Sequence, residues 1–77
     1  MKLKITVHAQ YRIAERNIDL DHIKRAIDKP DSKKADPGGQ IKVKKKINGK
    51  SIEVVYFTEG FKDTHNTHVI VTAYYTS

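Results

Sequence analysis

The first residues alternate between polar and apolar side chains. Leu3 and Ile5 stand between polar neighbours, which predicts a strand with one buried face over residues 2–6. From Val7 the apolar spacing lengthens to three and four residues, which predicts a helix. Its expected buried stripe comprises Val7, Tyr11, Ala14 and Ile18. Asn17 tolerates a left-handed backbone, so it is the expected end of this helix.

A second helix is predicted directly after the first. Asp19 has the short acceptor side chain that is favoured at an N-cap, and Asp21 suits the positive end of the helix dipole. The helix is expected to end at Lys29-Pro30, because the residue before a proline avoids the helical region. Its expected buried stripe comprises Leu20, Ile23 and Ile27.

Residues 30–39 are rich in Asp, Lys, Pro and Gly and are expected to form a polar loop. Asn48-Gly49 then marks a hairpin, since this dipeptide favours a type I′ turn. A two-residue turn sets the register, and it places on one face Ile41, Val43, Ile47, Ile52, Val54 and Tyr56. The other face carries Lys42, Lys44, Lys46, Ser51 and Glu53. Lys45 would fall on the apolar face, near its solvated end.

A loop over residues 59–67 and a last strand from His68 to Tyr75 complete the pattern. Consecutive strands pair most simply as a meander. The sequence therefore predicts an α+β fold of order β-α-α-β-β-β. Two helices would pack on one face of a small antiparallel sheet and leave the other face open. Because so short a chain can build only one modest core, residues 1–77 are expected to form a single domain.

The charge is confined to one part of the chain. Fifteen Lys and Arg against nine Asp and Glu give a net charge of +6. Residues 29–50 contain eight lysines and two acids, so they account for all of it. A concentrated positive patch attracts polyanions, which predicts nucleic-acid binding by Lys42, Lys44, Lys46 and Lys50. The alternative is a solvated lysine surface that only keeps the protein soluble.

Several classes of protein are excluded by what the sequence lacks. No apolar run approaches the roughly 20 residues of a membrane span, and no signal peptide follows Met1, so a cytoplasmic protein without membrane contact is expected. The absence of Cys excludes disulfides and thiolate metal sites. His65 and His68 lack accompanying Cys or carboxylates at a ligand spacing. Neither a metal nor another cofactor is therefore expected.

One face of the first helix has the chemistry needed to cleave RNA. His8, Arg12 and Arg16 follow one another at intervals of four residues. Cleavage through the 2′-hydroxyl needs a proton acceptor, a proton donor and positive charge for the developing phosphorane. Histidine titrates near neutral pH, and arginine fits phosphate oxygens. The alternative is an ordinary solvated helix face, with Glu15 and Asp19 paired to the arginines.

The last strand offers one aromatic side chain to the open face. Its even-numbered residues form the more polar set, so Tyr74 is predicted to lie there and Tyr75 on the core side. Tyr74 could then stack on a base or orient a proton. His22, in the polar half of the second helix, needs no function.

The segment from His8 to Ile18 resembles the start of the domain-of-unknown-function 4258 family. That family typically begins with a His-Ala pair, has an arginine four residues after the histidine and another four further on, and closes with an isoleucine. The Pro-containing loop, the Gly-bearing hairpin and the strand from Val69 to Tyr74 are similar too. The resemblance therefore covers nearly the whole chain.

Members of that family resemble the RelE/ParE-like small toxins. The resemblance implies a RelE-like fold and a toxin-type, metal-independent endoribonuclease that acts on RNA, from a toxin–antitoxin-like system. It implies an acidic antitoxin or immunity protein as a partner, and it assigns the catalytic positions to His8, Arg12, Arg16 and Tyr74. The alternative is a non-catalytic module that binds nucleic acid or inhibits a protein partner.

Overall fold

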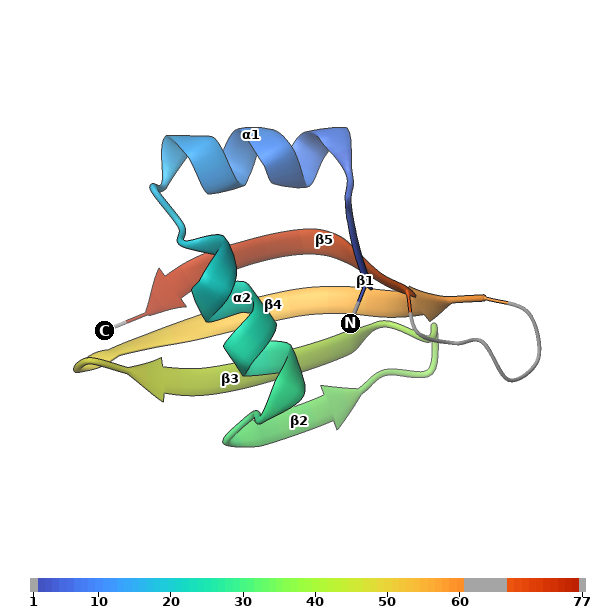
Figure 1. The fold of residues 1–77 in the computed structure, drawn as a ribbon. Coiled ribbons are helices and arrows are strands. Elements are labelled where there is room, and N and C mark those ends of the chain that lie inside the picture. The colour runs from blue at the N-terminus through green and yellow to red at the C-terminus, as the bar shows by residue number, and fades with distance from the viewer. Residues whose placement is uncertain (1, 61–66, 77) are drawn as a thin grey trace.

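A computed structural model describes residues 2–60 and 67–76 of the chain. Its elements, in order, are β1 (Lys2–Ile5), α1 (Val7–Glu15), α2 (Leu20–Asp28), β2 (Ser32–Ala35), β3 (Ile41–Ile47), β4 (Lys50–Glu59) and β5 (Thr67–Thr76). The five strands form one sheet in the order β1-β5-β4-β3-β2 (Figure 1). The predicted α+β class is confirmed. Neither described helix is long and apolar enough to cross a bilayer.

The predicted meander and hairpin register are confirmed. β4 pairs antiparallel with β3 on one side and with β5 on the other. Ile47 stands opposite Lys50 and Val43 opposite Val54, as a two-residue turn requires. Asn48 and Gly49 both have positive φ, at 51° and 83°, which is the backbone of a type I′ turn.

The sheet is mixed, so the prediction of a purely antiparallel sheet is wrong. β1 pairs parallel with β5, and its register runs from Lys2 opposite Thr67 to Ile5 opposite Ile70. Parallel neighbours need a long crossover connection. Here that crossover contains both helices and three strands. The local pattern around β1 predicts a strand, but it carries no information about a partner that follows more than 60 residues later.

The polar loop predicted over residues 30–39 contains a strand instead. β2 pairs antiparallel with β3, with Ser32 opposite Lys44 and Ala35 opposite Ile41. All four β2 residues are exposed. A strand without a buried face has no apolar alternation, so the sequence pattern could not show it. β2 is a lysine-bearing edge strand held by main-chain hydrogen bonds, and lysines at such an edge discourage pairing with another chain.

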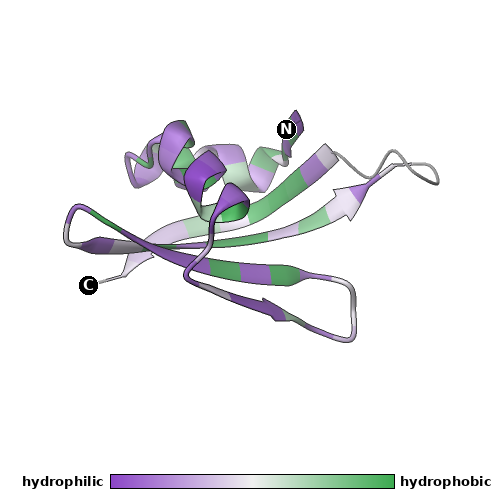
Figure 2. Ribbon diagram, turned by 60° about the horizontal axis from the view of Figure 1, so that its bottom comes forward, coloured by the Kyte–Doolittle hydropathy of each residue, from purple (hydrophilic) through white to green (hydrophobic). Residues whose placement is uncertain are grey.

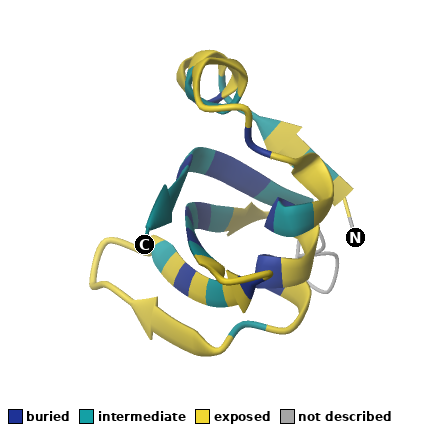
Figure 3. Ribbon diagram, turned by 90° about the vertical axis from the view of Figure 1, so that its left-hand side faces the viewer, coloured by how far each residue is buried: buried dark blue, intermediate teal, exposed yellow. Residues whose placement is uncertain are grey.

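The core lies between the helices and one face of the sheet. Figure 2 shows hydrophobic segments on the central strands, whereas β2 is almost entirely hydrophilic. In Figure 3 the buried segments gather on β4, β5 and the facing side of α2, while exposed residues dominate α1 and β2. The largest fully buried side chains of the core are those of Ile23, Val43, Ile52, Val54 and Ile70. α2 lies across β3 and β4 on this face, whereas α1 packs chiefly against β5 and runs along its edge (Figure 1). The predicted packing of two helices on one face therefore holds for α2, and α1 adds to the same core mainly through Ala9.

A β-bulge in the pairing of β4 with β5 changes which residues of β5 share a face. The register shifts between Val55 and Tyr56, so Tyr56 stands opposite Ile70 while Val54 stands opposite Ala73. Ile70 and Ala73 are therefore both in the core. The prediction of one polar face for all even-numbered residues is wrong, because the extra residue reverses the alternation.

The buried face of α1 differs from the predicted stripe. Val7 and Tyr11 are 69% and 73% exposed, and Ala14 is exposed too. Ala9 is buried instead and Ile13 is partly buried. Two sets of apolar residues in this short helix have helical spacing. The sequence pattern favours the set with Val7 and Tyr11, whereas the structure buries the set with Ala9 and Ile13. Of the predicted residues, Ile18 does lie in the core.

Thr6 sets the rotation of α1. Its N–H and its Oγ1 both donate to the carbonyl of Ile70, at 3.3 and 3.1 Å. The same Oγ1 accepts from the N–H of Ala9 at 3.1 Å, which caps the helix. The first turn is thereby fixed against β5, and the small side chain of Ala9 faces the sheet.

The second helix largely follows its prediction. Asp19 caps it by accepting from the N–H of Asp21 at 2.8 Å, and it ends before Lys29. Ile23 and Ile27 are buried, but Leu20 is 44% exposed and lies at the rim of the core. Lys45 Nζ donates to the carbonyl of Lys29 at 2.8 Å, so this lysine is on the helix-covered face as expected.

The orientation of α1 predicts that substitutions of two of its apolar residues differ in how much they destabilise the fold. Ile13→Ala is expected to lower the free energy of unfolding by about 1–2 kcal/mol, since it leaves a gap beside β5. Val7→Ala should change it by less than about 0.5 kcal/mol, because Val7 is solvated. Urea unfolding followed by circular dichroism measures both. A larger loss for Val7→Ala would contradict the orientation.

Candidate nucleic-acid interface

The open face of the sheet carries polar side chains in rows across the strands. Residues that stand opposite one another in antiparallel strands share a face. One such row consists of Ser32, Lys44, Glu53 and Tyr74. The neighbouring row consists of Lys34, Lys42, Val55 and Thr72. The lysines of β2 and β3 are thereby gathered next to an acid and a tyrosine from the central strands.

Two adjacent hollows lie between these side chains. The first is lined by Ser32, Lys34, Lys42, Lys44 and Glu53. The second, beside the turn between β2 and β3, is lined by Lys34, Ala35, Asp36, Gln40, Lys42 and Val55. They share Lys34 and Lys42, so we treat them as one surface and call it the lysine groove. Among the described residues, three lysines line it.

The structure separates the four predicted lysines. Lys42 and Lys44 line the groove, and Lys46 is on the same face opposite Ser51. Lys50 stands opposite Ile47 on the helix-covered face, where its Nζ is 5.7 Å from the ring centre of Tyr75. A residue shares the face of its register partner, so Lys50 lies apart from the other three lysines, and its role in binding nucleic acid stays a prediction. Lys34 was missed because the segment before β3 showed no strand pattern.

Arg16 and Tyr74 come together at the edge of β5. As predicted, Tyr74 is on the open face, opposite Glu53. Cζ of Arg16 lies 6.0 Å from the centre of its ring, and Nη1 donates to the carbonyl of Ala73 at 2.9 Å. β1 pairs with β5 only as far as Ile70, so Arg16 occupies the stretch of edge that β1 leaves uncovered. A guanidinium thus reaches the open face from the helix side.

Glu53 joins this tyrosine to the lysines. The pKa of the Tyr74 phenol is raised above 10.0, chiefly by hydrogen bonding to Glu53 and then by burial and by the charge of Glu53. Lys42 acts in the opposite direction and lowers it. The phenol is therefore held protonated. Sequence reasoning placed Glu53 on the open face but gave it no role. Only the register, which sets it between Lys44 and Tyr74, distinguishes it from other surface acids.

His8 and Arg12 do not line the lysine groove. Arg12 Nη1 lies 3.2 Å from Glu15 Oε1 on the surface of α1, as expected if the face is only a solvated one. Asp19, the other acid expected to pair with an arginine, caps α2 instead. His8 is exposed and makes no hydrogen bond with the described residues. The structure therefore brings together Arg16 and Tyr74, but neither of the other two helix residues.

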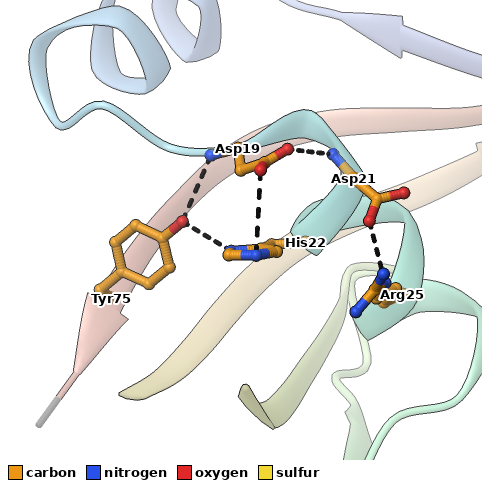
Figure 4. Close-up of polar contacts among 5 residues, drawn as sticks. All are labelled: Asp19, Asp21, His22, Arg25 and Tyr75. Atoms are coloured by element: carbon orange, nitrogen blue, oxygen red, sulfur yellow. Dashed lines mark hydrogen bonds and ion pairs between the residues drawn. The ribbon is translucent and has the colours of Figure 1, made fainter. Parts of the chain in front are cut away.

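A histidine that was given no function forms a second polar cluster (Figure 4). Nδ1 of His22 is 2.9 Å from the hydroxyl of Tyr75, which also accepts from the N–H of Asp19 at 3.2 Å. Nε2 of His22 is 3.9 Å from a carboxylate oxygen of Asp19. The cluster joins the start of α2 to the end of β5 on the helix-covered face. It therefore contributes to the packing of α2 and not to the groove.

The histidine pair considered for metal binding is only half described. His65 lies outside the described residues. The ring of His68 is 5.2 Å from that of Tyr56. Over residues 2–60 and 67–76, no three His, Asp or Glu side chains are grouped so that they could hold a metal ion.

A comparison with protein families finds one match that spans most of the chain. The model of the family described as "Domain of unknown function (DUF4258)" matches residues 5–75. This range includes α1, the lysine groove and Tyr74. No curated protein and no solved structure matches the chain.

The contact of Glu53 with Tyr74 can be tested by titration. Glu53→Gln removes the charged acceptor, so the pKa of Tyr74 is expected to fall toward 10.0. Titration of the ¹³Cζ resonance of Tyr74 by NMR measures the change. Glu59→Gln, an exposed acid on the same strand, is the control and should leave the titration unchanged.

The raised pKa of Tyr74 also makes the free energy of unfolding depend on pH in the alkaline range. Since the folded-state pKa lies above the unfolded value of 10.0, the stabilising contribution is complete below pH 10. It is lost as the pH rises through the folded-state pKa. Glu53→Gln should weaken this alkaline loss. An unchanged pKa in Glu53→Gln would contradict the contact.

Proposed function

The chain belongs to the family described as domain of unknown function 4258, and we propose that it is a toxin-type, metal-independent endoribonuclease with a RelE-like fold. The observation that carries the proposal is the meeting of Arg16 with Tyr74 beside the lysine groove. In this proposal, RNA lies along the groove and is cut next to Tyr74. An acidic antitoxin or immunity protein would be the partner that covers the same basic surface.

RNA binding is supported by the arrangement of the lysines. Lys34, Lys42 and Lys44 line a shallow groove in which the phosphates of a single strand can lie side by side with ammonium groups. Lys46 extends the same face toward the hairpin turn. Because each phosphate contact releases counterions, affinity for RNA should depend steeply on salt.

The chemistry that we propose uses the groups around Tyr74. Arg16 and Lys42 neutralise the non-bridging oxygens of the scissile phosphate. Glu53 accepts the proton of the 2′-hydroxyl, whose oxygen attacks phosphorus to form a cyclic phosphate. The bond to the 5′-oxygen breaks, and that oxygen takes the proton of the Tyr74 phenol. Protonated Glu53 then returns a proton to Tyr74, its hydrogen-bonding partner, so no proton is gained or lost.

This scheme gives Glu53 and Tyr74 the proton transfers for which the sequence indicated His8, at the 2′-hydroxyl or at the leaving 5′-oxygen. Glu53 stands opposite Tyr74 in the ladder, whereas no described contact connects His8 with it. His8 and Arg12 would instead lie on the flank of α1, where they extend the positive surface. The scheme is therefore specific about which side chains are needed.

Cleavage of a single-stranded RNA in the presence of EDTA tests the catalytic assignment. Arg16→Ala, Glu53→Gln and Tyr74→Phe are each expected to lower the rate on the order of 100-fold, because each removes a charge or a proton-transferring group. His8→Ala is expected to retain at least about a tenth of the rate. Equal cutting by all the proteins would contradict the site, and a loss confined to His8→Ala would restore the histidine as the proton carrier.

A non-catalytic module that binds nucleic acid or inhibits a protein partner is the second candidate. It is favoured by the hydrogen bond that Arg16 donates to the carbonyl of Ala73, since this bond occupies a guanidinium that catalysis would use. The pairing of Arg12 with Glu15 also fits a helix face that is only solvated. The lysine groove would have the same importance in this case. Turnover distinguishes the two candidates, because only the enzyme releases cleaved RNA.

Salt dependence tests the surface whichever candidate holds. Lys34→Ala is expected to reduce the slope of log affinity against log salt by about 1, because one phosphate contact is lost. Lys50→Ala is the matched control and should leave the slope unchanged, since Lys50 is on the opposite face. Fluorescence anisotropy with a labelled RNA measures both. A reduced slope only in Lys50→Ala would contradict the groove.

A further inference from the structure

The hollow beside the turn between β2 and β3 has a composition that the phosphate-binding lysines do not explain. Its apolar lining residues are Ala35 and Val55, and its lining also includes Asp36 and Gln40 from the turn. Lys34 and Lys42 border it. A hollow with an apolar wall, hydrogen-bonding groups at one edge and cations alongside suits a nucleobase flanked by phosphates.

The turn holds the carboxylate of Asp36 in place. Its Oδ1 accepts from the N–H of Gln40 at 3.1 Å, and its own N–H donates to the carbonyl of Gln40 at 2.9 Å. Gly39 completes the turn with a φ of 90° and donates its N–H to the carbonyl of Asp36 at 3.1 Å. Within the described chain, Oδ2 of Asp36 has no hydrogen bond or ion pair. A carboxylate with spare acceptor capacity is thus fixed at the edge of the hollow.

We propose that this hollow is a guanine subsite of the lysine groove, and the proposal rests on RNA being the ligand of that groove. Guanine has two adjacent donors on its Watson–Crick edge, N1–H and the N2 amino group, which match the two oxygens of a carboxylate. Adenine and cytosine have a ring-nitrogen acceptor beside their amino group, and uracil has one donor between two acceptors. Asp36 therefore selects guanine, while Val55 packs against the face of the base.

The subsite lies at a useful distance from the proposed cleavage position. Lys42 and Val55 are each two residues along their strands from Lys44 and Glu53. Two residues of a strand span about 7 Å. A strand of RNA that places a phosphate beside Glu53 and Tyr74 therefore reaches the hollow with a neighbouring nucleotide. The two shared lysines then contact the phosphates on either side of the bound guanine.

Inosine provides the test, because it differs from guanosine only by the missing N2 amino group. The probes are labelled 2′-O-methyl hexanucleotides of adenosine with one central guanosine or inosine, which cannot be cleaved through the 2′-hydroxyl. Fluorescence anisotropy is expected to show about 10-fold tighter binding of the guanosine probe. Asp36→Asn should abolish this ratio, although its amide oxygen can still accept from Gln40. Glu59→Gln, an exposed acid outside the groove, should preserve the ratio.

The outcomes separate this inference from the proposed activity. The subsite would be supported if the wild type binds the guanosine probe more tightly than the inosine probe and Asp36→Asn does not. This result would hold even if ordinary RNA is never cut. Equal binding of both probes would overturn the subsite even if RNA is cut. An unchanged ratio in Asp36→Asn would overturn the role of the carboxylate. Binding of guanosine 5′-monophosphate as tight as that of the guanosine hexanucleotide would overturn the subsite as part of an RNA groove and identify a free nucleotide as its occupant.

Discussion

The register of the β3–β4–β5 meander is the constraint on which the rest of the structure depends. Side chains alternate between the faces of a strand, so a slip of one residue would exchange the core for the open face. The Asn48-Gly49 turn sets the register of β3 against β4. Core residues such as Val43 and Val54 then face the helices together. The same register places Lys44, Glu53 and Tyr74 in one row on the opposite face, so folding and the proposed site share one geometric cause.

The edge of β5 determines how the first helix contributes. Thr6 binds the carbonyl of Ile70 at the end of the pairing with β1, and Arg16 binds the carbonyl of Ala73 further along. The helix between these anchors leaves Val7 and Tyr11 in solvent. In return, a strand edge that could pair with another chain is covered, and a guanidinium is brought beside Tyr74. One pair of contacts therefore protects the sheet and extends its cationic surface.

The lysine groove is formed by side chains on the open face of the sheet, so the proposed chemistry occurs on an open surface. Solvent weakens electrostatic interactions on such a surface, so several cations are needed where a single buried charge would be enough. The lysines of β2 and β3 provide them. Glu53, one of two acids that line the groove, lies opposite Tyr74, whose raised pKa keeps the phenol protonated. An acid inside a basic groove is what distinguishes this surface from a purely solubilising one.

The sequence by itself determined the class of elements, the hairpin register and the location of the charge. These properties follow from local alternation, from turn residues and from counting, and they need no knowledge of distant contacts. Tertiary structure alone decided the parallel pairing of β1, the exposed strand β2, the bulge in β5 and the rotation of α1. Each depends on partners far apart in the chain. For the same reason Tyr74 could be placed from its strand, whereas Lys34, Asp36 and Glu53 became candidates only once the sheet aligned them.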